Sequence, residues 1–108
     1  MTPTLGPSVS IMPCPPVRLD ELQARIVALV QGDGCEVRRV DDAIVVDLLI
    51  LPSVEKIADA IKAWLDGHPE VKSIDFKGRA GEGTLPDAKN KHVKTAMRGL
   101  IRLAANVD

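Results

Sequence analysis

Residues 35–50 read CEVRRVDDAIVVDLLI, a pattern of two apolar runs separated by two aspartates. Two runs rich in β-branched residues, 35–40 and 43–50, flank Asp41 and Asp42, a polar pair that suits a tight turn. The second run is almost continuously apolar, which is typical of a central strand covered on both faces, whereas the first has the composition of an edge strand. The sequence therefore predicts a β-hairpin with one edge strand and one central strand.

Apolar residues at helical spacing predict three amphipathic helices around this hairpin. The first covers residues 19–30, the second follows Ser53 as its N-cap, and the last opens near Pro86 or Asp87. Residues 71–76 suggest a third strand. Because a helix joins it to the second run of the hairpin, we expect these two strands to be parallel neighbours.

The predicted fold class is therefore α+β (mixed α/β), a single small domain of order α-β-β-α-β-α with a three-stranded mixed sheet. Five prolines in residues 1–17 predict a flexible Pro-rich leader, which leaves residues 18–108 as the domain. No apolar run is long enough to cross a bilayer and the amino terminus is unlike a secretory signal, so we expect a cytoplasmic protein without membrane contact.

The net charge of −1 hides an uneven distribution. Residues 1–76 hold 7 basic and 12 acidic side chains, whereas residues 77–108 hold 7 basic and 3 acidic ones. Such a division can mark an anionic partner at the basic end, or the two parts can pair with each other in the fold. Pairing within the fold is the simpler interpretation.

Four basic residues of the last predicted helix, Lys91, Lys94, Arg98 and Arg102, lie three or four residues apart and form one stripe. A stripe of this kind can follow nucleic-acid phosphates. The alternative is a solvated helix face whose cations favour the carboxyl end of the helix dipole.

The glycine-rich segment 77–85 contributes two further cations, Lys77 and Arg79, to this tentative anion site. We expect a mobile loop between a strand and a helix, where backbone N–H groups can hold an anion. The segment lacks the Lys-Ser/Thr ending of a P-loop and the dinucleotide-binding pattern.

No set of residues predicts catalysis, a cofactor or a metal. Asp47 is a carboxylate inside an apolar strand, and we expect either an ion pair with Arg38 or Arg39 of the adjoining strand or exposure at an edge. A buried structural role is expected for the thiol of Cys35, and solvent exposure for His68 and His92. Cys14, Cys35, His68 and His92 are the soft metal ligands of the sequence, and they are not spaced as the ligands of a metal site are.

Two families share part of the element order. Residues 19–65 are similar to the start of a type II K-homology RNA-binding domain, and residues 36–76 to the opening of a STAS domain. The G-x-x-G of residues 78–81 follows a predicted strand instead of joining two helices, and the STAS phosphorylation turn is missing. We therefore assign the chain to neither family.

The leading hypothesis is a small non-enzymatic binding or regulatory module that acts through a protein partner. Self-association through the edge strand at residues 35–40, or through a helix face, belongs to this hypothesis. The alternative is binding of nucleic acid or another anion through the basic helix and the glycine-rich segment.

Overall fold

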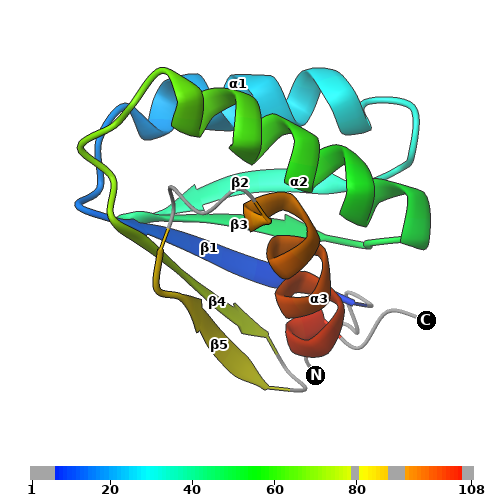
Figure 1. Ribbon diagram of the computed structural model, residues 1–108. Helices are drawn as coiled ribbons and strands as arrows, with labels where there is room; N and C mark the ends of the chain where they lie inside the picture. Colours follow the sequence, from blue (N-terminus) through cyan, green and yellow to red (C-terminus); the bar gives the residue numbers. More distant parts are fainter. Residues whose placement is uncertain (1–6, 79–80, 88–91, 106–108) are drawn as a thin grey trace.

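The computed structural model describes residues 7–78, 81–87 and 92–105. Within these ranges the chain forms a compact α+β unit with three helices and a five-stranded antiparallel sheet (Figure 1). None of the described helices is long and apolar enough to cross a bilayer. In chain order the elements are β1 (Val9–Cys14), α1 (Leu19–Val30), β2 (Glu36–Val40), β3 (Ala43–Asp47), α2 (Leu51–Asp66), β4 (Ser73–Gly78), β5 (Glu82–Leu85) and α3 (Val93–Ala105).

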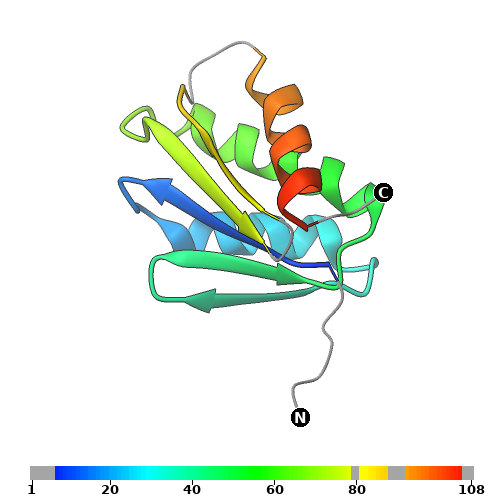
Figure 2. The ribbon, with the colours of Figure 1, turned by 90° about the horizontal axis from the view of Figure 1, so that it is seen from below.

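The strand order across the sheet is β2-β3-β1-β4-β5, and every neighbouring pair is antiparallel. From β1 to β4 this is the path of the split βαβ, or ferredoxin-like, arrangement, to which β5 and α3 are added. All three helices lie on one face of the sheet, and the other face carries no helix (Figure 2).

The prediction of a flexible leader is wrong for residues 9–14, which form the central strand β1. Val9 and Ile11 alternate with less buried residues and enter the core, as expected for a strand of period two. Proline is tolerated at position 13 because the pairing with β3 ends at Ile11, so no ladder bond toward β3 needs its missing N–H.

The central position of β1 also corrects the predicted three-stranded mixed sheet. Strands β3 and β4 both pair antiparallel with β1, so they run in the same direction, as expected for strands joined through α2. They are not neighbours, because β1 lies between them. The sheet is therefore entirely antiparallel.

The hairpin predicted within residues 35–50 is confirmed, and its second strand, β3, ends at Asp47. Val40 pairs with Ala43 across a two-residue turn, in which Asp41 has a φ of 54°. Strand β2 forms an edge of the sheet, and β3 is an interior strand whose five residues are all buried.

The glycine-rich segment does not form the predicted loop between a strand and a helix. It is the hairpin of β4 and β5, in which the Gly78 amide donates to the Gly81 carbonyl at 2.8 Å. Two of its glycines let α3 approach the sheet. A Cβ at position 78 would overlap the Ala104 carbonyl oxygen, and one at position 83 would lie 2.6 Å from Leu100 Cδ2.

Two predicted helix starts are also corrected. Helix α2 begins at Leu51, with Ile50 in extended conformation as its N-cap, so Ser53 lies inside the first turn. Pro86 and Asp87 are not helical, and α3 begins at Val93.

The core lies between the sheet and the helices. It is largely aliphatic, as the composition requires, and both aromatic residues, Trp64 and Phe76, are fully buried in it.

Candidate binding groove between α2 and α3

Two of the predicted basic residues on α3 form ion pairs with the acidic face of α2. Lys94 contacts Asp59, and Arg98 Nη1 donates to Glu55 Oε1 at 2.7 Å. The uneven charge distribution of the sequence is therefore in part the charge complementarity of two packed helices. Lys91, the first member of the stripe, lies outside the described residues.

Arg102 differs from the other described cations of the stripe. It is exposed in the last turn of α3, and no carboxylate of the described ranges pairs with it. It lies one turn beyond Arg98 on the same side of the helix. Among the members of the stripe that the structure describes, Lys94, Arg98 and Arg102, this guanidinium is the one that is available to an external anion.

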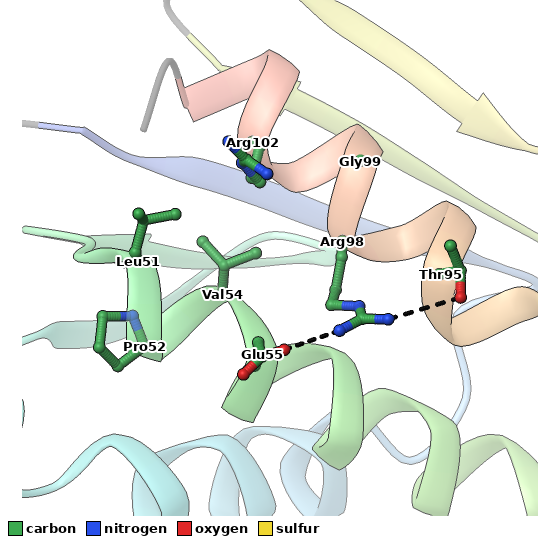
Figure 3. A pocket seen from close by; sticks show the side chains of 8 residues that line it. All are labelled: Leu51, Pro52, Val54, Glu55, Thr95, Arg98, Gly99 and Arg102. Atoms are coloured by element: carbon green, nitrogen blue, oxygen red, sulfur yellow. Dashed lines mark hydrogen bonds and ion pairs between the residues drawn. The ribbon is translucent and has the colours of Figure 1, made fainter. Parts of the chain in front are cut away.

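Between these helices lies a groove of about 590 Å³, whose lining is shown in Figure 3. Leu51 and Val54 project from the first turn of α2 toward α3, and Arg98 reaches across to Glu55. The α3 side is open at Gly99, where a Cβ would meet no atom within 4 Å. The lining residues are Leu51, Pro52, Val54, Glu55, Thr95, Arg98, Gly99 and Arg102.

The groove combines an apolar floor with a positive end. Leu51 is 41% exposed, and its neighbours Leu48 and Ile50 are exposed to a similar extent, so apolar surface extends beyond the groove itself. The groove also lies at the amino end of α2, which has no side-chain cap and no acidic residue in its first turn. The partial positive charge of this helix end is therefore offset not by a residue of the first turn but by Asp33, whose carboxylate accepts a hydrogen bond from Ser53 there.

The structure does not unite the two halves of the predicted anion site. Lys77 faces the helix-free side of the sheet, because the alternate residues Ile74 and Phe76 of β4 enter the core. On that side it stands opposite Glu82 of β5. Arg79 lies outside the described residues. Lys77 and the α3 cations are therefore on opposite faces of the sheet.

The predicted neutralisation of Asp47 is confirmed, with Arg38 as the partner. Arg38 Nε donates to Asp47 Oδ2 at 2.9 Å, and only 2% of the Asp47 side chain is exposed. This bond and the charge of Asp47 raise the pKa of Arg38 above its usual value. The pair joins β2 to β3 on the helix-free face, so the buried Asp47 carboxylate has a charged partner.

Sequence reasoning missed a polar cluster where the chain enters β2. Ser53 Oγ donates to Asp33 Oδ2 at 3.0 Å, and Lys56 Nζ donates to Asp33 Oδ1 at 2.8 Å. The Cys35 thiol lies 3.2 Å from Ser53 Oγ. The hydrogen bond from Lys56 is the main cause that lowers the pKa of Asp33 below its ordinary value of 3.8, against the opposing effect of burial.

This cluster has a structural explanation. It connects the turn before β2 to the first turns of α2, and its three contacts join residues that lie 18 to 23 positions apart in the sequence, which no local motif reveals. No histidine takes part in it, so the thiol has no imidazole base beside it.

His68 is not solvent-facing, contrary to the prediction. Only 14% of its side chain is exposed, its ring lies 4.8 Å from that of Trp64, and its nitrogens approach Glu21 and Glu70. His92 is exposed, as predicted. Across residues 7–78, 81–87 and 92–105, no three His, Cys, Asp or Glu residues are grouped so that they can hold a metal ion.

Comparison with known protein families, with curated proteins and with solved structures yields no match to this chain.

Proposed function

We propose that this protein is a non-enzymatic binding module that takes an acidic, apolar segment of a partner protein into the groove between α2 and α3. The observation that carries the proposal is the combination of exposed apolar side chains at the start of α2 with the guanidinium of Arg102, which pairs with no carboxylate in the described part of the chain. A segment with both leucine-like and carboxylate side chains matches this combination.

A peptide segment of this kind matches the groove in two ways. Leu51 and Pro52 are exposed and offer apolar contact area, which supplies most of the free energy of peptide docking. Arg102 offers a charge-assisted hydrogen bond to a carboxylate.

The alternative of nucleic-acid binding has less support. A protein that follows a phosphate backbone needs several cations free to contact phosphates. Lys94 and Arg98 are already paired with α2, and Lys77 lies on the other face of the sheet. The two aromatic residues are both buried, so neither is available for base stacking.

The test is fluorescence anisotropy with a labelled short peptide of leucine and glutamate residues. A peptide with lysine in place of glutamate and labelled single-stranded DNA and RNA serve as comparisons. Arg102→Glu should weaken binding of the acidic peptide about tenfold, because attraction becomes repulsion. The matched control is Arg25→Glu, the same charge change on exposed α1 outside the groove.

Equal binding of the acidic and basic peptides, or equal loss in both variants, would contradict the groove proposal. Nucleic-acid binding that falls steeply with added salt would favour the alternative function.

A further inference from the structure

Among the described residues, strand β2 leaves one row of backbone groups without a strand partner. It is the outermost of the described strands at its end of the sheet, where it pairs with β3 (Figure 2). Four of its five residues are exposed and the fifth, Val37, is half-buried. An edge of this kind can pair with a strand of another chain.

The turn decides which residues direct their backbone groups outward. In a two-residue hairpin the residues that flank the turn form a hydrogen-bonded pair, here Val40 and Ala43. Hydrogen-bonded and non-hydrogen-bonded pairs then alternate along the strand, so Val40, Arg38 and Glu36 bond to β3. Val37 and Arg39 direct their N–H and C=O groups away from the sheet.

Charge selects one register for pairing of β2 with itself. A two-fold pairing centred on Arg38 places Arg38 against Arg38 of the second copy, and one centred on Arg39 places two Arg39 side chains together. A pairing centred on Val37 instead places Glu36 opposite Arg38 of the second copy, and symmetry repeats this pair. It also uses the outward backbone groups of Val37.

We propose that two copies of this chain associate through antiparallel pairing of their β2 strands, with Val37 on the two-fold axis. Arg38 uses Nε for Asp47, which leaves its terminal nitrogens for Glu36 of the second copy. Helix α1 packs over the β2 side of the sheet (Figure 1), and its Val27 and Leu29 are 41% and 43% exposed. The proposal goes beyond the groove, because it uses a different surface and a different partner.

Sedimentation equilibrium over a range of protein concentrations tests the association. The unmodified protein should form a dimer, and Glu36→Lys should raise its dissociation constant about tenfold, because two symmetric attractive pairs become repulsive. The matched control is Glu82→Lys on β5, the same charge change on the other edge strand, which should leave the dissociation constant unchanged. A monomer at all concentrations overturns the proposal, as does equal weakening by both variants.

The register has its own test, which uses a native thiol. In the pairing centred on Val37, position 39 stands opposite Cys35 of the second copy. Arg39→Cys should therefore form a disulfide between the new thiol and Cys35 of the second copy on mild oxidation, a pair that mass spectrometry identifies. Arg39 is exposed, so the change should not disturb the fold. A link between two thiols at position 39, or a dimer without any link, overturns this register.

Discussion

The two edges of the sheet differ in how much of each is used inside the chain. Strand β5, four residues long, packs against α3, and Leu85 at its end is buried. Strand β2, five residues long, is mostly exposed and packs more sparsely against α1. Helix packing is therefore denser over one edge strand than over the other, which exposes the charged side chains of Glu36, Arg38 and Arg39.

Glycine makes this difference possible. Gly78 and Gly83 remove the side chains that would hold α3 away from β4 and β5, so backbone meets backbone at Ala104. No glycine lies within β2, and its edge stays open. Intramolecular packing is thus concentrated at one end of the sheet, and the opposite end is the natural place for a second chain.

The largest expected effect comes from closing the space beneath α3. Gly78→Ala should destabilise the fold by about 3 kcal/mol, because its Cβ would overlap the Ala104 carbonyl and lie 2.8 Å from that of Ser8, and backbone cannot rotate away. The free energy of unfolding in urea measures this. Gly81→Ala is the control, since a Cβ there meets nothing within 4 Å. Similar values for both variants would show that α3 does not depend on this contact.

A smaller effect is expected at the open edge. Arg38→Met should lower the urea midpoint, because Asp47 would keep a buried charge without its partner. Arg39→Met is the matched control on the same strand, where no ion pair is lost among the described residues. If the urea midpoint falls equally in both variants, the Arg38–Asp47 ion pair does not stabilise the packing of β2 against β3.

The β2–β3 hairpin was predictable because its signals are local. Residues 35–50 contain both apolar runs, their β-branched residues and the two-residue turn between them. The assignment of an edge strand and an interior strand follows from the composition of the same two runs. The Arg38–Asp47 pair was predictable for the same reason, since the residues are close across one hairpin. Long-range features had no comparable signal.

Strand β1 shows why the prediction failed elsewhere. The five prolines of residues 1–17 mask the alternation of Val9 and Ile11. Whether a proline destabilises this strand depends on where its pairing with β3 ends, which the sequence does not reveal. The glycines of the β4–β5 hairpin are ambiguous in a similar way, because glycine is favoured both in a mobile loop and where a helix packs closely against a strand. Among the described residues of the predicted anion site, Arg98 and Arg102 reach the groove whereas Lys77 and Lys94 do not, because the packing of α2 against α3 is a property of the tertiary fold.

The next prediction concerns acid pH and the turn that leads into the open edge. Since the folded pKa of Asp33 is lowered, its contribution to stability is complete above its ordinary value of 3.8 and is lost as the pH falls through the folded pKa. Asp33→Asn should therefore be less stable than the unmodified protein at about pH 6, and the difference should shrink toward about pH 2.5. Urea unfolding at both pH values measures it. The matched control is Asp42→Asn, the same substitution at an exposed position of the hairpin turn.

The smallest change in stability is expected where α2 and α3 meet over the groove. Glu55→Gln removes an exposed ion pair with Arg98, and such pairs contribute less than about 1 kcal/mol. The same change frees the Arg98 guanidinium at the groove, so affinity for the leucine–glutamate peptide should rise about threefold while stability hardly moves. Asp59→Asn is the control, because Asp59 pairs with Lys94, which does not line the groove. If both variants raise the affinity equally, the gain comes from net charge and not from the groove, and the peptide proposal loses its geometric basis.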